Sequence, residues 1–309
     1  MFLDKVLKKK TDLLNLENIN LKISDLYSLK NISFNIHNLD FVCIGGDENC
    51  DFLMKIMAGF ISPDSGKISF NKTPLFGGVN LTQIYRHFSY VDNNNTLYGH
   101  LTILENLEYF GTLHDMQGHI LDKNISKLLK MVEVGKYKNM KVCDLPLTLI
   151  KKANILCSLI NNPKILFVNN FTNDLDHESR KEIFSLLKKL KNHGMTVIVS
   201  DMDYEPFSKL FDHLIIIQRG KLTYDSKNKK GDFKMLYKIT FKSDPGDYGN
   251  FLKVLEDHKQ ISSVQIIGDK CILSLKDDAN LMLGLSRLLK DYSEKLISFN
   301  YEKIEVKNE

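Results

Sequence analysis

The sequence lacks any arrangement of cysteines that would hold a metal ion or build a disulfide framework. Zinc sites and disulfide-rich folds both need paired or closely spaced cysteines. This chain has no C-x-x-C pair and no cluster of histidine with cysteine. Its five cysteines are scattered at Cys43, Cys50, Cys143, Cys157 and Cys271. We therefore expect no metal site and no disulfide, and a reducing cytosol fits this cysteine usage.

Long apolar runs are also missing. No stretch reaches the length of about 18 apolar residues that a membrane-spanning helix needs. The opening MFLDKVLKKK has no signal-peptide core before polar residues resume. We expect the chain neither to span a membrane nor to be exported. Residues 1–10 form either a frayed terminus or a short basic amphipathic arm that touches the membrane.

A strong excess of one charge is absent as well. The 42 Lys and Arg residues against 38 Asp and Glu leave a net charge of +4, and we expect no nucleic-acid partner. The basic cluster of Lys227, Lys229 and Lys230 is either a solvated surface or a contact for anionic lipid headgroups. With 309 residues, 43% of them hydrophobic, the chain can bury a large core and form two domains.

The pattern of apolar residues in the first part of the chain predicts alternating strands and helices. Two short buried-strand runs flank a helix, an order typical of a parallel sheet. Between residues 101 and 134 apolar residues recur at helical spacing, with Leu104, Leu107 and Phe110 on one face. The expected strands are 14–23, 32–36, 41–45, 165–168 and 197–200, and the expected helices include 52–59, 153–159 and 178–193.

Beyond a polar, basic linker at residues 226–232 the pattern changes. The expected strands are 236–241, 264–267, 271–275 and 296–301, the expected helices are 248–256 and 280–289, and a turn is expected at 268–269. The order β-α-β-β-α-β is typical of a ferredoxin-like α+β domain. We therefore predict two domains, residues 1–230 and residues 231–309.

Five stretches of the sequence resemble the ATP-binding subunit of an ABC transporter. They are LENINLKISDLYSLKNISFNI (16–36), LMKIMAGFISPDSGKISFN (53–71), LYGHLTILENLEYFGTLH (97–114), NNPKILFVNNFTNDLDHESRKEIFSLLKKL (161–190) and GMTVIVSDM (194–202). The C-terminal part is similar to the addition found in ATPases of ABC-2 exporters. The resemblance implies an α/β fold with a P-loop-NTPase-like ABC ATPase core, a helical subdomain at about 95–150, and a small C-terminal ferredoxin-like α+β domain.

Nearly every position that the family uses for chemistry carries a different residue. The phosphate loop reads Gly45, Gly46, Asp47, Glu48, Asn49, Cys50, Asp51 and Phe52, and the family lysine falls on Cys50 or on Asp51, depending on the direction of counting. The adenine-stacking aromatic residue corresponds to Ile23, the metal-sensing glutamine to Asn93, and the switch histidine to Met202. The Asp-Glu pair becomes Asn169 and Asn170. The signature LSGGQ becomes Leu145, Pro146, Leu147, Thr148 and Leu149, whereas the interface segment Asn173, Asp174, Leu175 and Asp176 is retained.

The acidic loop argues against tight triphosphate binding on physical grounds alone. A phosphate loop binds through backbone N–H groups at a helix N-terminus, a lysine and a hydroxyl that holds magnesium. Here Asp47, Glu48 and Asp51 bring negative charge instead. At an effective dielectric near 20, a like-charge pair at about 4 Å costs on the order of 4 kcal/mol before screening. We expect Asp51 to cap a helix that begins near Phe52.

The other replaced positions predict the same loss of function. Asparagine cannot act as a base, so Asn169 and Asn170 either satisfy backbone groups at a strand end or keep a weak catalytic role. Pro146 removes an N–H group but suits the first turn of a helix. We expect Phe171 to pack at the nucleotide face and occlude it.

The histidines carry no recognisable catalytic arrangement. They lie near the ends of predicted elements without acidic partners at the spacing of a triad, so we expect surface or capping roles. These residues are His37, His100, His177 and His213.

The sequence therefore predicts a pseudo-ATPase with no catalytic residue, no metal and no cofactor, which binds Mg-ATP weakly at most. The resemblance implies two partners: a membrane permease whose coupling helix contacts the groove near residues 93–101, and a homologous ATPase subunit. It also implies a cytoplasmic location on the inner face of the membrane. Two alternatives remain: a nucleotide hydrolase with weak activity, and a free-standing regulatory or immunity protein.

Overall fold

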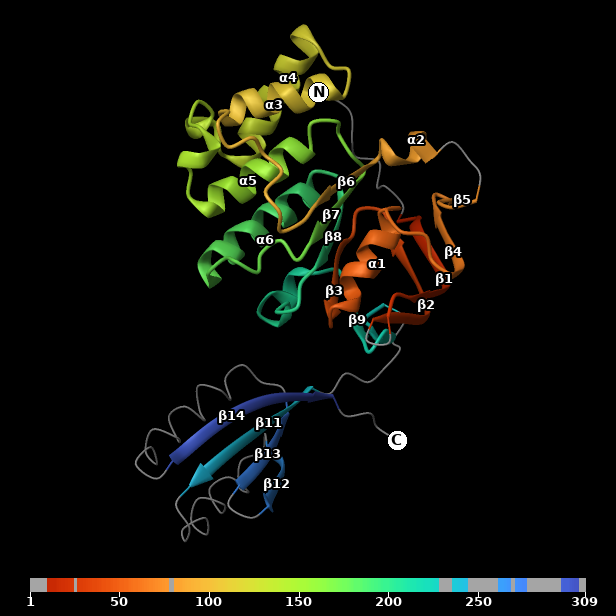
Figure 1. The fold of residues 1–309 in the computed structure, drawn as a ribbon, viewed down its shortest axis with the longest axis vertical. Helices are drawn as coiled ribbons and strands as arrows, with labels where there is room; N and C mark the ends of the chain where they lie inside the picture. Colours follow the sequence, from red (N-terminus) through yellow and green to blue (C-terminus); the bar gives the residue numbers. More distant parts are fainter. Residues whose placement is uncertain are drawn as a thin grey trace. The chain divides into compact units, whose positions relative to one another are not determined.

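The protein divides into two compact units, Met1–Lys230 and Gly231–Glu309. The computed structural model describes residues 10–24, 27–77 and 81–227 of the first unit. In the second unit it describes the backbone of four strands, at 235–243, 261–267, 270–276 and 296–305. The two units are treated separately below (Figure 1).

A six-stranded sheet forms the centre of the first unit, in the order β10-β9-β3-β8-β7-β6. The strands from β9 to β6 are parallel, and β10 pairs with β9 antiparallel at the edge. The strand bounds are β3 Phe41–Gly46, β6 Phe88–Val91, β7 Ile165–Asn169, β8 Thr196–Ser200, β9 His213–Gln218 and β10 Lys221–Asp225. The predicted parallel sheet is confirmed, since its central strands are short apolar runs buried on both faces.

A second, antiparallel sheet covers one side of the first unit (Figure 1). Its order is β2-β1-β4-β5, with bounds β1 Asp12–Lys22, β2 Ser28–His37, β4 Ser65–Phe70 and β5 Thr73–Pro74. Its strands alternate buried and exposed residues, as a sheet with one solvated face should.

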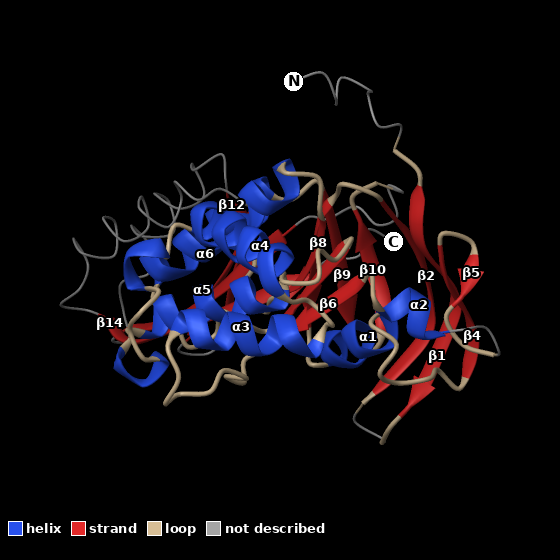
Figure 2. Ribbon diagram, turned by 90° about the horizontal axis from the view of Figure 1, so that it is seen from above, coloured by secondary structure: helices blue, strands red, loops and turns tan. Residues whose placement is uncertain are grey.

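The helices lie on the two faces of the central sheet. Helices α3 to α6 gather on one side (Figure 2), whereas α1 packs between the central sheet and the antiparallel sheet (Figure 1). The bounds are α1 Asn49–Met57, α2 Leu81–Tyr85, α3 Ile103–Leu113, α4 Gly118–Val132, α5 Leu147–Ser158 and α6 His177–Asn192. The predicted helical stretch at 101–134 thus forms α3 and α4, and α3 begins with a capping box formed by Thr102 and Glu105.

Strand β7 shows how the sequence builds two separate cores. Leu166 and Val168 belong to the cluster under α3 to α6, whereas Ile165 and Phe167 belong to the cluster under α1 and the antiparallel sheet. Because side chains alternate along a strand, an unbroken apolar run supplies both faces at once. The polar Asn169 follows this run, so β7 delivers it to the edge of the sheet where the candidate site lies.

The second unit contains an antiparallel sheet in the order β12-β13-β11-β14. Its bounds are β11 Met235–Ser243, β12 Ile261–Ile267, β13 Lys270–Lys276 and β14 Leu296–Glu305. This order, with the first and third strands central, is the one expected for a β-α-β-β-α-β chain. The helices predicted at 248–256 and 280–289 and the turn predicted at 268–269 lie outside the described residues.

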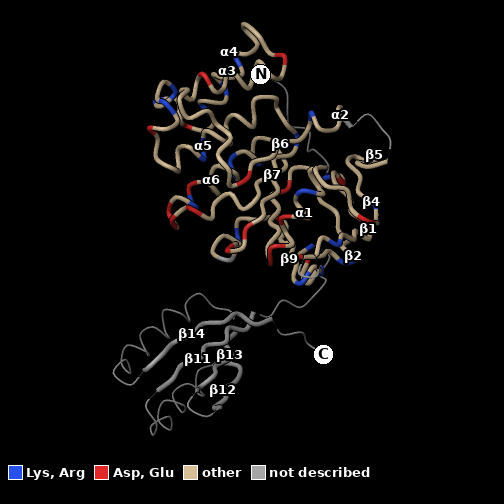
Figure 3. Tube along the Cα trace, in the orientation of Figure 1, with Lys and Arg blue, Asp and Glu red and all other residues tan. Residues whose placement is uncertain are grey.

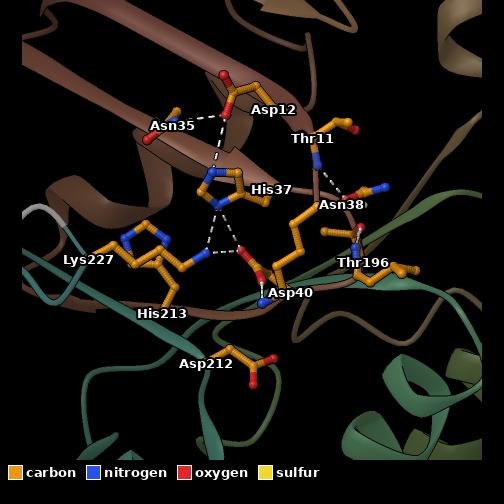
Figure 4. Close-up of polar contacts among 12 residues, drawn as sticks. Thr11, Asp12, Asn35, His37, Asn38, Asp40, Thr196, Asp212, His213 and Lys227 are labelled. Atoms are coloured by element: carbon orange, nitrogen blue, oxygen red, sulfur yellow. Dashed lines mark hydrogen bonds and ion pairs between the residues drawn. The ribbon is translucent and has the colours of Figure 1, made fainter. Parts of the chain in front are cut away.

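A buried carboxylate joins the two ends of the described part of the first unit (Figure 4). Asp40, with no exposed side-chain surface, accepts hydrogen bonds from Lys10 at 2.8 Å and from Lys227. Lys227 also donates to Nδ1 of His37, and Nε2 of His37 lies 3.2 Å from Asp12. Burial alone would raise the pKa of Asp40, but the hydrogen bonds from the two lysines outweigh it and lower that pKa.

Two of the histidine predictions are therefore wrong. His213 is fully buried, with Nε2 at 2.8 Å from Asp225, and His37 lies between Asp12 and Asp40. Their acidic partners come from other strands, which a local sequence pattern does not reveal. His100 and His177 are exposed, as predicted, and His177 stacks on Phe207.

Among the described residues, no helix has the length and apolar character needed to cross a membrane. Cys43, Cys50, Cys143 and Cys157 are free thiols, and no group of metal-binding side chains occurs within the described ranges. Along the described trace of the first unit, acidic and basic positions are interspersed (Figure 3).

Candidate nucleotide site

The loop from Gly45 to Asp51 lies where a phosphate loop belongs, between the end of β3 and the start of α1 (Figure 1). Both of its glycines are needed for close contacts. A Cβ atom on Gly45 would lie 2.3 Å from the ring of Tyr204. Gly46 has φ +131°, and a Cβ atom there would lie 1.8 Å from the carbonyl oxygen of Ile217 on β9. The loop is therefore packed against its neighbours and not only supported by β3.

Four backbone N–H groups of this loop, those of Asp47, Asn49, Cys50 and Asp51, already have partners inside the protein. The amide of Asp47 donates to the carbonyl of Ile217 at 3.2 Å, and the amide of Asn49 donates to the Asp47 carboxylate at 3.0 Å. The amides of Cys50 and Asp51 donate to carbonyl oxygens within the loop, at 3.0 and 3.2 Å. A phosphate loop binds its ligand through such amides. Here these four amides are occupied.

Side chains tie the same loop to two neighbouring turns. The Asp47 carboxylate accepts the backbone N–H of Arg219, in the turn between β9 and β10. From the turn between β1 and β2, the Tyr27 hydroxyl donates to Glu48, and the backbone N–H of Ser28 donates to Asn49 at 3.0 Å. The hydrogen bond to Glu48 raises the pKa of Tyr27.

The ring of Tyr27 also covers the start of α1. It packs against the ring of Phe52, with centroids 5.7 Å apart. Ile23, the position predicted to correspond to the adenine-stacking residue, is 44% exposed. Tyr27, and not Ile23, places an aromatic ring beside the start of α1, and its hydroxyl binds the protein's own carboxylate, that of Glu48.

Helix α1 begins earlier than the sequence predicts, and Asp51 does not cap it. The helix starts at Asn49, and Asp51 already lies inside its first turn. The Asp51 carboxylate instead makes an ion pair with Lys55 at 2.6 Å and accepts a hydrogen bond from the side-chain amide of Asn169. The prediction failed because Asp47, four residues earlier, satisfies the amide of Asn49 and lets the helix start sooner.

The second candidate for the family's lysine position, Cys50, is buried and uncharged. Its thiol donates to the carbonyl of Gly45 at 3.3 Å. Burial, aided by the charge of Asp47, raises the pKa of Cys50 far above its ordinary value, so the thiol does not ionise near neutral pH. The family's lysine position falls on Cys50 or on Asp51, and neither side chain is a cation.

Asn169 links side chains and does not merely satisfy backbone groups. Its amide nitrogen donates to Asp51, and its carbonyl oxygen accepts from the hydroxyl of Ser200. Asn170 has φ +47°, in the left-handed region that asparagine tolerates, and its backbone N–H donates to the Ser200 hydroxyl at 3.1 Å. The prediction that Asn169 satisfies backbone groups at a strand end is therefore corrected. Its side chain joins α1, β7 and β8.

Asn93 sits between a buried lysine and the retained interface segment. Its side-chain oxygen accepts from the ammonium of Lys151 at 2.6 Å, and its amide donates to Asp174 at 2.7 Å. The same ammonium lies 4.5 Å from the centroid of the Phe171 ring. We expected Phe171 to pack at the nucleotide face and occlude it. Its side chain is only 1% exposed and belongs to the core under the helices.

The degenerate signature segment still opens a helix. Pro146 is the N-cap residue directly before α5, one position ahead of the first turn in which it was predicted, and Leu145 is buried. Leu147 is 43% exposed, whereas Leu149 packs partly against the core. The Thr148 hydroxyl donates to Ser179 on α6 at 3.0 Å.

The interface segment and the switch segment are fixed by ion pairs and caps. Asp176 caps α6 by accepting from the backbone N–H of Ser179 at 2.9 Å. In the switch segment Met202 is 45% exposed. Its neighbour Asp201 is buried and pairs with Arg180 at 2.8 Å.

Residues 29–173 match a protein-family model described as ABC transporter. Over these residues the chain is similar to ABC transporter ATP-binding domains. Spermidine/putrescine import ATP-binding proteins PotA are similar to it: that of Photobacterium profundum is 22% identical over 227 residues, covering 72% of this chain and 59% of that protein. That of Mycoplasma capricolum is 26% identical over 219 residues, covering 69% and 61%. The chain thus spans about three fifths of the length of these relatives.

Solved ABC structures share the fold of the ATP-binding domain. The cbiO1 protein of Clostridium perfringens, part of the ABC transporter complex cbiONQ, aligns with a TM-score of 0.64 at 22% identity and covers 70% of this chain and 88% of its own. The dimeric cassette MJ0796, bound to ADP and phosphate, aligns with a TM-score of 0.60 at 25% identity and covers 69% and 98%. The predicted α/β ABC ATPase fold is confirmed.

Three residues that shape this part of the chain could not be singled out from the sequence, namely Tyr27, Arg180 and Lys151. Tyr27 was not singled out because its partner Glu48 is 21 positions away, in another element. Arg180 lies in the first turn of α6 among exposed residues. Lys151 precedes the buried Ile155 by four positions, so helical periodicity alone would have placed it on the buried face of α5.

Proposed function

We propose that this chain is a catalytically impaired ATP-binding subunit of an ABC transporter, a pseudo-ATPase. The observation that carries the proposal is the self-bonded loop, whose amides donate to Ile217, to Asp47 and within the loop itself. A triphosphate would have to displace these bonds. It would also meet the carboxylates of Asp47, Glu48 and Asp51, which repel it.

The positions around the loop support the loss of hydrolysis as well. ATPases of this kind need a carboxylate or an equivalent group to orient the attacking water, and a lysine and Mg²⁺ to neutralise the developing charge. This chain offers the amide of Asn169, already bonded to Asp51 and Ser200, and the exposed thioether of Met202. Neither can accept a proton near neutral pH.

A permease and a second ATPase subunit are the partners we propose. Similar proteins include a part of an ABC transporter complex and a cassette solved as a dimer. Near the segment expected to contact the permease, Tyr98 and Tyr109 are 40% and 41% exposed, with their rings edge to face at 4.9 Å. Such exposed aromatic pairs suit a protein interface.

Binding to a permease would place the chain at the inner face of the membrane as a peripheral protein. The strand order of the second unit, β12-β13-β11-β14, is the observation that favours an ABC-2 exporter. The similar proteins include spermidine/putrescine import proteins. They also include a probable multidrug ABC transporter ATP-binding protein, YbhF of Escherichia coli. It is 26% identical over 172 residues, which cover 54% of this chain and 28% of YbhF.

A hydrolysis assay tests the proposal. The purified chain and its variant Asn170→Glu should both release phosphate from Mg-ATP at background rate, while a cassette with intact motifs serves as the positive control. Restoring one carboxylate leaves the lysine, the signature serine and the switch histidine absent. Turnover by the unmodified chain, or a large gain from the single substitution, would show that the site is functional.

A further inference from the structure

Lys151 is a buried cation with no acidic partner in contact. Its residue is 3% exposed, and within the described ranges no carboxylate lies at ion-pair distance from its ammonium. The ammonium donates to the side-chain oxygen of Asn93 at 2.6 Å and to its main-chain oxygen at 3.2 Å. The face of the Phe171 ring lies on another side, at 4.5 Å. Neutral groups thus supply all of its close contacts in this part of the chain.

Such an arrangement is costly, so the position of the ammonium depends on its few partners. Burial lowers the pKa of Lys151, and the more distant charges of Asp174 and Asp92 only partly oppose it. A buried charge must be compensated by hydrogen bonds or by another charge. Both hydrogen bonds in which the ammonium is the donor end on one residue, Asn93. The contact therefore fixes α5 to the segment that leaves β6.

Asn93 passes this contact on to a third segment. Its side-chain amide donates to Asp174 at 2.7 Å, in the loop that precedes α6. A continuous chain of bonds thus runs from α5 through Asn93 to the retained interface segment. On the neighbouring faces of α5, Thr148 donates to Ser179 at 3.0 Å and Lys152 pairs with Glu182, both on α6. Helix α5 is held to the rest of the unit from both sides.

We propose that Lys151 acts as a built-in cation that holds α5, the Asn93 segment and the Asn173–Asp176 loop in one arrangement without nucleotide or metal. The inference rests on the proposed function, because it assumes that no Mg-ATP enters the site to organise these three segments. In that arrangement Lys151 is a positioning residue that acts through Asn93. The surface offered to a permease or to a second subunit would then be the same whether or not ATP is present.

Hydrogen exchange of the full chain tests this idea. Unmodified protein should exchange residues 92–98 and 172–176 at the same rate with and without Mg-ATP. Lys151→Met keeps the length of the side chain and removes the charge, so exchange in both segments should rise on the order of tenfold, as expected for the loss of a hydrogen bond to a charged group. Lys130→Met, at an exposed position of α4, should change neither segment.

The result that overturns the proposal is unchanged exchange at 92–98 in Lys151→Met. If that variant does not fold, Asn93→Ala removes the acceptor from an exposed position and must have the same effect. In the double variant the two effects should not add, since both remove one contact. A calorimetric titration of the unmodified protein with Mg-ATP separates the two proposals. If Mg-ATP binds tightly and hydrogen exchange at residues 92–98 and 172–176 is still unaffected by it, the proposed function is contradicted. The positioning role of Lys151 is then still supported.

Discussion

The side-chain amide of Asn169, at the end of β7, donates a hydrogen bond to the carboxylate of Asp51, in the first turn of α1. The two residues are matched to each other. A carboxylate at position 169 would face the carboxylate of Asp51 at contact distance, and the two could not both ionise without a large cost. The acidic loop and the asparagine on β7 are therefore two parts of one altered site.

This match predicts the effect of restoring one carboxylate. Asn169→Asp should lower the free energy of unfolding at pH 7 by about 1 to 3 kcal/mol, because it replaces a donor by a like charge. The loss should shrink near pH 4, where one of the two carboxyl groups takes up a proton. Asn170→Asp is the matched control, since position 170 tolerates its left-handed backbone with either residue and should change stability little. Equal losses for the two variants in a urea titration would contradict the pairing.

The close packing of the loop predicts a second effect. Gly46→Ala should lower the free energy of unfolding by about 2 to 4 kcal/mol, because the new Cβ atom would overlap the carbonyl of Ile217 and the backbone is also left-handed. Gly77→Ala also has a positive φ, +99°, but no atom of the described residues lies within 4 Å, so it should cost only about 1 to 2 kcal/mol. A smaller loss at position 46 than at position 77 would show that the loop is not packed against β9.

The sequence was sufficient to predict the elements whose pattern is local. The run at residues 165–168 is apolar at successive positions, and the spacing of Leu104 and Leu107 is helical, so both patterns predict the elements β7 and α3 directly. The start of α1 was missed because it depends on a turn formed by Asp47. His213 was missed for another reason: its partner Asp225 comes from the opposite strand of a hairpin.

The candidate site was only partly predictable for the same reason. The replaced positions could be named from their spacing, but not their new partners. Asp51 meets Asn169, which is 118 positions further along the chain, and Lys151 meets Asn93, which is 58 positions away. These pairings are made by the fold, so the chemistry of the altered site becomes visible only when the strands and helices are assembled.

The buried carboxylate beneath the central sheet should stabilise the unit at neutral pH. Asp40→Asn should lower the free energy of unfolding at pH 7 by about 1 to 3 kcal/mol, less than for a fully enclosed pair, because Lys10 and Lys227 retain 55% and 22% of their side-chain exposure and can be rehydrated. Asp122→Asn, at an exposed position of α4, is the control.

The pH dependence of that loss follows from the lowered pKa of Asp40. Its contribution is fully present above the ordinary carboxyl value of 3.8 and is lost as pH falls through the lowered folded-state pKa. The difference between the unmodified protein and Asp40→Asn should therefore be constant from pH 7 to about pH 4 and shrink below it. A difference that already vanishes above pH 5 would contradict the lowered pKa.

The lowered pKa of Lys151 predicts a different pH dependence of stability from that of Asp40, at alkaline and not at acidic pH. Burial lowers its pKa below the ordinary 10.5, so between the two values the unfolded chain binds more protons than the folded one. The free energy of unfolding of the unmodified protein, measured against that of Lys151→Met, should rise as pH increases toward 10.5. Urea titrations from pH 7 to 10.5 measure this difference, and a fall over that range would mean that the charge of Lys151 is stabilised in the fold.

Calorimetric titration of the purified chain with Mg-ATP tests the central claim most directly. Because the loop amides are already bonded and Asp47, Glu48 and Asp51 repel phosphate, the account predicts a dissociation constant no tighter than the millimolar range. A cassette with an intact phosphate loop, titrated under the same conditions, is the positive control, because it should bind the same Mg-ATP. A micromolar dissociation constant for this chain would contradict the account.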